Sequence, residues 1–426
     1  MPRVQESVPF RYAVLSGANL AGAGCGFLVT LLIARSFGPQ GLGYVSLALA
    51  LLGYALEIST CGTSLRAVAQ AAADHTSIPA TIAAVITIRV VLSLAVYPVL
   101  IALSLAVPAF TEVDLLVAIY GLVLFANALN LVWVPQALHA SHMYAANSVA
   151  MQSLTLLLVL ACLGLGAGLW SVAASRALAE FVVAAALLLW AVRRVGRLRP
   201  PPDYGAVGRF ALASAPFGGA QTLRSLAIGA DPILLGLLVG AVELGYYASA
   251  YRIFMLLITL AAGYFVILLP RVAERAHDCN ALSRELRQSL RYALPVVLAV
   301  AVALAVSADT ALPLLFGSGF DAAAPALQLL GAALCTSVAA GHYRQVLLAR
   351  GRGRTDLCLI AAATAVHLLS KLLLIPVIGI TGAALGTLIG ELFLAIALRR
   401  AALKELMRAG GNGKVAKAPG AKKRGP

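Results

Sequence analysis

The chain of 426 residues is 61% hydrophobic and only 12% charged, and its formal net charge is +15. Soluble domains contain about 45–50% apolar and about 25% charged residues, so this composition excludes a water-soluble enzyme. Apolar blocks of about 20 residues or more recur along the chain, as in Ala13 to Ile33, and this length crosses the hydrocarbon core of a bilayer. The alternation over about ten residues that is typical of membrane β-barrels is missing from the sequence, so spanning helices are predicted.

Apolar blocks that are separated by charged joints predict about twelve transmembrane helices. In the first half of the chain they are expected near residues 10–34, 43–64, 80–106, 114–135, 146–167 and 170–192. In the second half they are expected near residues 210–239, 246–270, 291–315, 323–348, 357–377 and 382–398. The predicted fold class is therefore an all-α polytopic membrane protein.

Lysine and arginine residues gather in every second joint. They lie near the N-terminus, in residues 193–209, 271–291 and 350–354, and from Arg399 onward. The opposite joints hold Arg35 alone, together with several acidic residues. Because positively charged joints remain on the cytoplasmic side, both termini are predicted to lie in the cytoplasm.

The remaining basic charge does not indicate a nucleic-acid partner, because no joint is long enough to form a folded aqueous domain that presents it. Residues 401–426 are rich in Gly, Lys and Pro. This tail is expected to be a disordered basic cytoplasmic strand that lies near anionic lipid headgroups.

One joint occurs twice in the chain. The sequence GPQGLGY, which starts at Gly38, recurs as GAVELGY, which starts at Gly240, and each copy joins the first two helices of its half. This repeat predicts two homologous six-helix lobes, residues 1–200 and 201–400, that are related by a pseudo-two-fold axis along the membrane normal. A substrate path is expected between the two lobes.

A small set of charged residues lies within the predicted helices. A charge that faces lipid at mid-depth costs about 2.5–3.5 kcal/mol on insertion scales, so these residues are expected to face the protein interior or a water-filled cavity. The deep cations are Arg89, Arg176, Arg224, Arg252 and Lys371. Arg344 also lies within a predicted helix but is left out of this count, and Arg35 lies at an outer edge. The acids are Glu57, Glu180, Asp231 and Glu391.

The depth of each charge, at about 1.5 Å per helical residue, predicts which charges pair. Helical spacing adds pairs that lie on one face of a single helix. The predicted pairs are Glu57 with Arg89, Asp231 with Arg252, Lys371 with Glu391, Arg176 with Glu180, and Arg224 with Asp231. Each pair is interpreted either as a structural ion pair or as an acid that binds a coupling proton or sodium ion. The set of cations is suited to phosphate or anionic sugar groups, which arginine binds with two parallel hydrogen bonds.

Small and polar residues also occur inside the predicted helices. Ala18, Gly22 and Gly26 are spaced by four residues, which indicates close helix packing or a bending point. The polar residues include Asn127, Asn130, Gln152, Gln221 and the stretch 148–155. They are interpreted either as hydrogen bonds between helices or as a lining for sugar hydroxyls.

Several motifs of enzymes and pumps are missing from the sequence. No G-x-x-x-x-G-K-[ST] sequence occurs, so ATP binding through a P-loop is not expected and any energy comes from a gradient. His139 and His142 have no further ligands nearby, so no metal site is predicted. The longest joint, from Arg271 to Arg291, indicates an amphipathic interfacial helix without a catalytic set. Neither a cofactor nor enzymatic activity is predicted.

Several stretches resemble bacterial polysaccharide-export flippases, which belong to the multidrug, oligosaccharidyl-lipid and polysaccharide exporter superfamily. The resemblance covers most of the chain. The stretches are ARSFGPQGLGYVSLALALLGYALEI, FGGAQTLRSLAIGADPILLGLLVGA, GYYASAYRIFMLLITLAAGYFVILLPRVAE, LLFGSGFDAAAPALQLLGAA and LLIPVIGITGAALGTLIGE.

The resemblance implies that the chain moves an undecaprenyl-diphosphate-linked oligosaccharide from the inner to the outer leaflet of the bacterial inner membrane by alternating access. It also implies a cationic cavity whose basic residues receive the diphosphate or acidic sugars. Arg35, Arg224 and Arg252 stand in the resembling stretches, whereas Arg89, Arg176 and Lys371 rest on their depth alone. The count of about twelve helices favours the O-antigen, capsule or exopolysaccharide type over lipid II flippases. A polysaccharide polymerase and glycosyltransferases are the candidate protein partners.

Two alternatives remain. A gradient-driven multidrug exporter of the same superfamily is expected to have a more acidic cavity for cationic drugs, whereas the deep cations of this chain outnumber the acids by one. The other alternative is a membrane enzyme or a non-transporting component of a glycan-assembly complex, for which the purified protein would not move a lipid-linked oligosaccharide in liposomes and deletion would leave the surface glycan unchanged.

Overall fold

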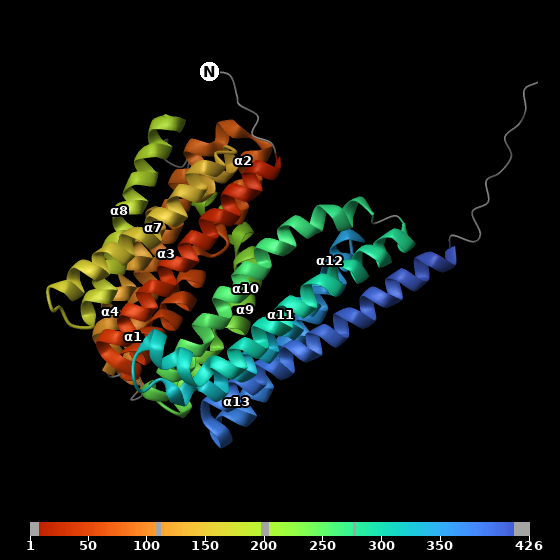
Figure 1. The fold of residues 1–426 in the computed structure, drawn as a ribbon. Helices are drawn as coiled ribbons and strands as arrows, with labels where there is room; N and C mark the ends of the chain where they lie inside the picture. Colours follow the sequence, from red (N-terminus) through yellow and green to blue (C-terminus); the bar gives the residue numbers. More distant parts are fainter. Residues whose placement is uncertain (1–7, 108–111, 197–203, 276–277, 413–426) are drawn as a thin grey trace, which may run out of the picture.

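The computed structural model describes residues 8–107, 112–196, 204–275 and 278–412. All regular secondary structure within these ranges is helical, which confirms the predicted class (Figure 1). The helices are α1 (Val8–Thr60), α2 (Thr63–Ala73), α3 (Ile78–Ala106), α4 (Asp114–Gly121), α5 (Val123–Leu129), α6 (Trp133–Ala137), α7 (Ser141–Gly164), α8 (Trp170–Val195), α9 (Tyr204–Leu238), α10 (Ala241–Glu274), α11 (Cys279–Phe316), α12 (Ala324–Ala349) and α13 (Gly353–Asn412).

Nine stretches of the described chain are long and apolar enough to cross a membrane. Two of them are bent into arms. α1 bends at Gly38, whose φ is 66°, and Pro39 follows directly. α13 bends at Ile378 and Gly379, where the φ of the glycine is 58°. A positive φ is favourable for glycine but strained for most other residues, so both bends fall in predicted joints where the chain carries glycine.

Two helices of the first half are interrupted within the bundle. The second arm of α1 ends before Cys61 (φ 45°) and Gly62 (φ 68°), and α2 begins at Thr63. The helix predicted over residues 114–135 is one apolar span made of three consecutive short helices. Leu122 between α4 and α5 keeps a helical conformation, whereas Asn130 between α5 and α6 has an extended backbone. Backbone groups are freed at both interruptions, and in a bilayer they need partners from the protein.

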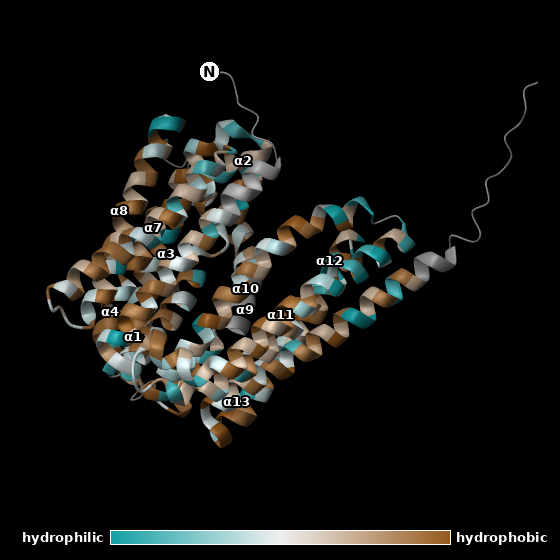
Figure 2. Cartoon of the chain, viewed as in Figure 1, coloured by the Kyte–Doolittle hydropathy of each residue, from teal (hydrophilic) through white to brown (hydrophobic). Residues whose placement is uncertain are grey.

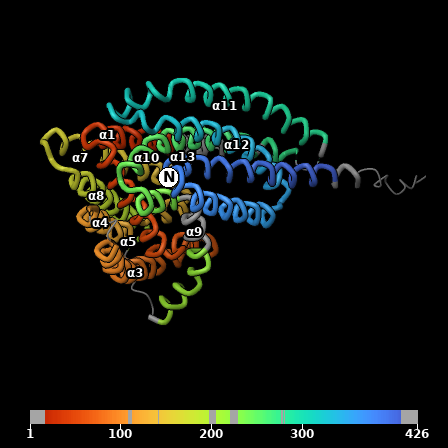
Figure 3. The backbone as a smooth tube through the Cα atoms, turned by 90° about the horizontal axis from the view of Figure 1, so that it is seen from below, coloured from red at the N-terminus to blue at the C-terminus, as the bar shows by residue number. Residues whose placement is uncertain are grey.

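The helices form two bundles that converge at one end of the molecule and diverge at the other (Figure 1). Figure 3 shows the same helices from the converging end. α1 to α8 make up one bundle, and α10 to α13 the other. α9 packs on both bundles, since Val207 near its start lies against α3 and Asp231 near its end binds α13. We call the two groups the first bundle and the second bundle.

The helices of both bundles are apolar over much of their length (Figure 2). Val99, Leu212 and Val306 are 65%, 75% and 79% exposed, which would be unfavourable in water but suits the hydrocarbon of a membrane. The interior contains many small residues. On α8, Ala173, Ala184 and Ala191 are fully buried, and such small side chains let helices approach closely without a hydrophobic driving force.

Candidate functional site

Arg252 on α10 lies where the second bundle meets the first arm of α1. A Cβ atom on Gly26 would overlap the Nη2 atom of Arg252, so glycine at this position leaves room for the guanidinium group. One turn away, the Cα of Gly22 faces α7, where a Cβ atom would lie 3.5 Å from Cγ of Gln152 and 3.7 Å from Oγ of Ser148. The predicted close packing is confirmed at Gly26, where the close neighbour is a charged group, whereas a Cβ atom on Gly22 would make an ordinary van der Waals contact.

Arg176 and Glu180 on α8 form the predicted ion pair, with 3.5 Å between Nη2 and Oε2. The side chain of Arg176 is 29% exposed and that of Glu180 is 7% exposed. Asn130 donates to Oε1 of Glu180 at 3.2 Å and so holds the carboxylate in place. The Nε atom of Arg176 is buried and has no hydrogen-bond partner. Because the side chain is 29% exposed, the ion pair still leaves part of the guanidinium group accessible.

Arg176 and Arg252 come from different bundles and lie within electrostatic range of each other. Among the side chains that the structure describes, Arg252 forms no ion pair, and Glu180 is the carboxylate that contacts Arg176. Two guanidinium groups and one carboxylate leave a net positive charge between the bundles. Such a pair of forked donors is suited to bind phosphate oxygens with parallel hydrogen bonds. We call Arg176 and Arg252, with Gly26 and Gln152, the central cationic site.

A second group of charges lies between α9, α10 and α13. Nζ of Lys371 lies 2.6 Å from Oδ1 of Asp231, and the hydroxyl of Tyr247 donates to Oδ2 of Asp231 at 2.6 Å. Asp231 is 1% exposed and Lys371 is 4% exposed. The predicted pairing of Asp231 with Arg252 is therefore wrong. Depth along the helices does not specify which helices are neighbours, and the end of α9 packs on α13.

Glu391 is also paired differently from the prediction. Its Oε1 atom lies 3.7 Å from Nε2 of His367, one turn from Lys371 on the first arm of α13. The predicted pair of Lys371 with Glu391 is wrong because Asp231 takes the ammonium group. A Cβ atom on Gly390 would overlap the His367 ring, so the two arms of α13 pack closely at this level.

Arg89 on α3 joins the two interrupted helices and is 2% exposed. Its Nε donates to the hydroxyl of Thr63 at 2.9 Å, and Nη2 to the hydroxyl of Ser64 at 2.6 Å, both at the start of α2. Nη1 donates to the backbone carbonyls of Asn127 and Asn130 at the end of α5. The predicted ion pair of Arg89 with Glu57 is therefore wrong, because hydroxyl and carbonyl oxygens bind the guanidinium group instead. Arg89 thus satisfies backbone and hydroxyl groups where the helices break, and Asn130 links it to Glu180, the partner of Arg176.

Replacement of Arg89 by alanine should destabilise the folded protein by about 3 kcal/mol or more, because hydrogen bonds from a charged donor are lost at two buried helix ends. Lysine should rescue little, since it lacks the planar fork of donors. The measurement is the midpoint of thermal unfolding in detergent, with the exposed Arg193→Ala as control. If Arg89→Ala keeps its unfolding midpoint but loses transport, Arg89 is a substrate-binding residue, as the sequence predicts, and not a structural one.

The remaining predicted site residues, Arg35, Arg224 and Glu57, lie on α1 and α9. Arg35, at the exposed end of the first arm of α1, donates from Nε to the carbonyl of Leu315 at 2.9 Å and from Nη2 to that of Leu314 at 2.6 Å. Arg224 lies on α9 within residues 220–228, whose side chains are outside the described part, so its predicted pairing with Asp231 stays a prediction. Glu57 lies on the second arm of α1 and has interactions within the protein.

The sequence reasoning missed the hydroxyl groups that bind the buried charges. Tyr247 was not singled out, although it follows directly on the repeated joint and binds Asp231. Thr63 and Ser64 were also missed. Gly62 before them was the available signal, because a glycine inside an apolar block often marks the end of a helix, where hydroxyl side chains replace backbone partners.

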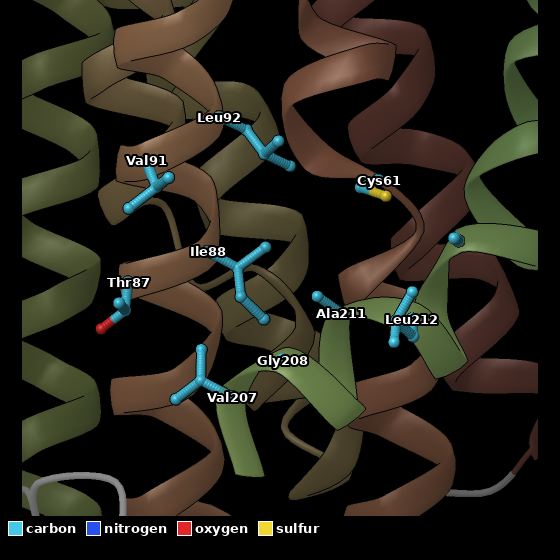
Figure 4. Close-up of a pocket in the computed structure, with 10 residues that line it drawn as sticks. Cys61, Thr87, Ile88, Val91, Leu92, Val207, Gly208, Ala211 and Leu212 are labelled. Atoms are coloured by element: carbon cyan, nitrogen blue, oxygen red, sulfur yellow. The ribbon is translucent and has the colours of Figure 1, made fainter. Parts of the chain in front are cut away.

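An apolar hollow of about 380 Å³ lies between α3 and the start of α9 (Figure 4). Ile88, Val91 and Leu92 line it from α3, and Val207, Ala211 and Leu212 line it from α9. Charged side chains do not line this hollow, so it is chemically distinct from the central cationic site. Among the described residues, no group of three or more His, Cys, Asp or Glu side chains is placed to hold a metal ion.

Comparisons with known proteins agree with this architecture. A model of the polysaccharide biosynthesis protein family matches residues 11–275, which is more than half of the chain. The fold is similar to that of the lipid II flippase MurJ in its inward closed conformation, with a TM-score of 0.77 and 12% identity over 95% of this chain and 91% of that chain. No curated protein matches the sequence significantly.

Multidrug transporters are similar in fold as well. An inward-facing multidrug resistance MATE family transporter of the MOP superfamily has a TM-score of 0.64 and 17% identity, over 97% of each chain. A MATE transporter of Vibrio cholerae has a TM-score of 0.60 and 17% identity, over 93% of this chain and 97% of that chain. Identities this low show a shared fold alone.

Proposed function

Because the chain belongs to the polysaccharide biosynthesis protein family of the MATE and MurJ exporter superfamily, we propose that it is a lipid-linked oligosaccharide flippase. The family is one of transporters and not of enzymes. The substrate would be an undecaprenyl-diphosphate-linked repeat unit of an O-antigen, capsule or exopolysaccharide. The protein would move it from the inner to the outer leaflet of the bacterial inner membrane by alternating access.

The proposed topology has twelve crossings. The two bent stretches cross twice each, and α9 adds a crossing to those of the other long helices. The basic joints would lie in the cytoplasm with both termini, in accord with the positive-inside rule. The converging end of the bundles, with Gly38 and Gly240, would then face outward. In this orientation the structure would correspond to an inward-facing state, because the bundles diverge toward the basic joints.

The single observation that carries the proposal is the central cationic site. Arg176 and Arg252 come from opposite bundles, and Glu180 neutralises only one of their two positive charges. A diphosphate offers enough oxygens to bind both guanidinium groups at once. Arg224 is proposed as a further contact because it lies on α9, between the bundles. A separation of the bundles would then change both contacts together, as alternating access requires.

The buried acids are proposed as candidates for ion coupling, with the coupling ion a proton or sodium. Asp231 already has an internal cation in Lys371, and it lies within electrostatic range of Tyr54 and Tyr251. Glu180 and Glu391 lie beside Arg176 and His367, and their side chains are 7% and 21% exposed. Glu57 completes the candidate set. No cofactor is proposed.

Multidrug export is the second candidate function, and one observation disfavours it. A cationic drug would need acids at the point where the bundles meet, whereas the described residues there are two arginines with one carboxylate. The shared fold with MATE transporters does not decide the substrate. A non-transporting role in a glycan-assembly complex is the third candidate, in which a polymerase or glycosyltransferases would be the partners.

The membrane lipids are proposed partners at the apolar hollow between α3 and α9. Val91 and Leu212 at its edge are 58% and 75% exposed, so the hollow opens toward the bilayer. An alkyl chain is the ligand class that suits such a lining.

The proposed function is tested by deletion of the protein and a leaflet-resolved assay of lipid-linked intermediates. A flippase predicts accumulation in the inner leaflet and loss of surface glycan. The purified protein in liposomes should also move a lipid-linked oligosaccharide. Unchanged surface glycan after deletion, with no movement in liposomes, would exclude the flippase. Altered resistance to cationic dyes with normal glycan would identify a drug exporter.

A further inference from the structure

The two copies of the repeated joint are in direct contact with each other. A Cβ atom on Gly43 would overlap the backbone carbonyl oxygen of Ala241, and a Cβ atom on Gly245 would overlap that of Pro39. Gly245 is the repeat counterpart of Gly43, and Ala241 is the counterpart of Pro39. Each joint therefore contacts its counterpart reciprocally, as identical subunits do around a two-fold axis. We call this contact the glycine seam.

Glycine is required at both positions by the close approach of two backbones. Neither Gly43 nor Gly245 has a positive φ, so the requirement comes from space and not from backbone conformation. Leu42 and its counterpart Leu244 pack beside the glycines and are 2% and 0% exposed. The seam therefore excludes water where the two bundles converge.

Arg35 makes a polar contact across the same end of the molecule. It belongs to the first arm of α1, and its two donors bind the carbonyls of Leu314 and Leu315 in the last turn of α11. These carbonyls have no partner within their own helix, and a cation at a helix C-terminus is favourable. The repeat counterpart of Arg35 is Leu237, so this polar contact has no symmetric copy.

Aromatic side chains fill the space next to these contacts. Phe27 of α1 packs edge-on against Phe316 of α11 at 6.1 Å between ring centroids, and Tyr246 packs against Phe320 at 6.1 Å. Phe316 and Phe320 are 0% and 1% exposed. A displacement of the bundles at this end would have to separate the seam, the contact of Phe27 with Phe316 and the Arg35 hydrogen bonds together, whereas Tyr246 and Phe320 both belong to the second bundle.

We propose that the glycine seam is a gate between the bundles and that Arg35 is the latch that sets how often it opens. Gly43 and Gly245 permit closure, because a side chain at either position keeps the backbones apart. Arg35 stabilises the closed state alone, since its carbonyl partners move away with α11 when the gate opens. This inference rests on the proposed alternating access, but it concerns the conformational equilibrium and not the substrate.

The test measures access of a membrane-impermeant thiol reagent to Leu244→Cys, in a background whose six native cysteines are replaced. Leu42→Cys serves as a second probe if the first variant fails to fold. In the parent the closed seam should protect the thiol. Arg35→Ala should raise the labelling rate about tenfold, as expected for loss of a charge-assisted hydrogen bond, and Arg35→Lys should raise it less.

The glycines are tested with the Leu42→Cys probe. Gly245→Ala should keep the gate open and give fast labelling, whereas Gly263→Ala on the same helix should not, because no atom lies near its added Cβ. Unchanged labelling in Arg35→Ala, or equal labelling in the two glycine variants, would overturn the proposal. Labelling needs no substrate. If labelling changes as expected but the leaflet assay shows no flippase activity, the proposed function is refuted and the proposed gate still stands.

Discussion

Replacing Lys371 by alanine should lower the free energy of unfolding by about 3–5 kcal/mol, because it leaves the carboxylate of Asp231 buried without its cation. Tyr247 would still donate one hydrogen bond, but a phenol does not neutralise a charge. The measurement is the midpoint of thermal unfolding in detergent, with Lys404→Ala as control, since Lys404 is an exposed lysine on the same helix. An unchanged midpoint for Lys371→Ala would show that Asp231 does not carry a charge that needs this partner.

The double variant Asp231→Asn with Lys371→Met separates the structural from the coupling interpretation. It removes both charges together, so most of the lost stability should return. If this folded variant also transports, the pair only holds α9 on α13. If it folds and transports at a lower rate that no longer depends on a pH gradient, Asp231 carries the coupling proton.

Arg252→Ala should reduce transport of the lipid-linked oligosaccharide by about tenfold to a hundredfold while the protein level is retained. The reason is the loss of charge-assisted hydrogen bonds to phosphate, each worth about 1.5–3 kcal/mol. Arg252→Lys should lose less, because it keeps the charge but not the fork. Arg224→Ala is expected to act in the same direction. The measurement is the initial rate in proteoliposomes, with Arg194→Ala at the exposed end of α8 as control.

A matched pair of glycine variants tests the same site without removal of a charge. Gly26→Ala would push against the guanidinium of Arg252, whereas the Cβ of Gly24→Ala, two residues away, would meet no atom. Transport should fall several-fold in the first and remain at the parent rate in the second. Parent-rate transport in both Arg252→Ala and Gly26→Ala would remove Arg252 from the substrate site. Loss of protein level in Arg252→Ala would assign it to the fold instead.

The sequence predicted the helices well because crossing a bilayer imposes a length and a composition on each of them. The joints at Gly38 and Gly379 were also predictable, since an apolar run that turns back needs a residue that tolerates positive φ. The interruption at Cys61 and Gly62 was not predicted. The side chain of Arg89, from another helix, binds the groups that the break exposes. The hydropathy of a segment cannot show that a residue from another helix stabilises a break in it.

By itself, the sequence determined the helical fold, the repeat and the local pair of Arg176 with Glu180, because spacing on one helix determines which side chains meet. Only the tertiary structure decided the pairs between helices. Depth places two charges at one level, but the rotation of each helix and the choice of neighbour decide whether they touch. For that reason Asp231 binds Lys371, and Arg252 is left available at Gly26.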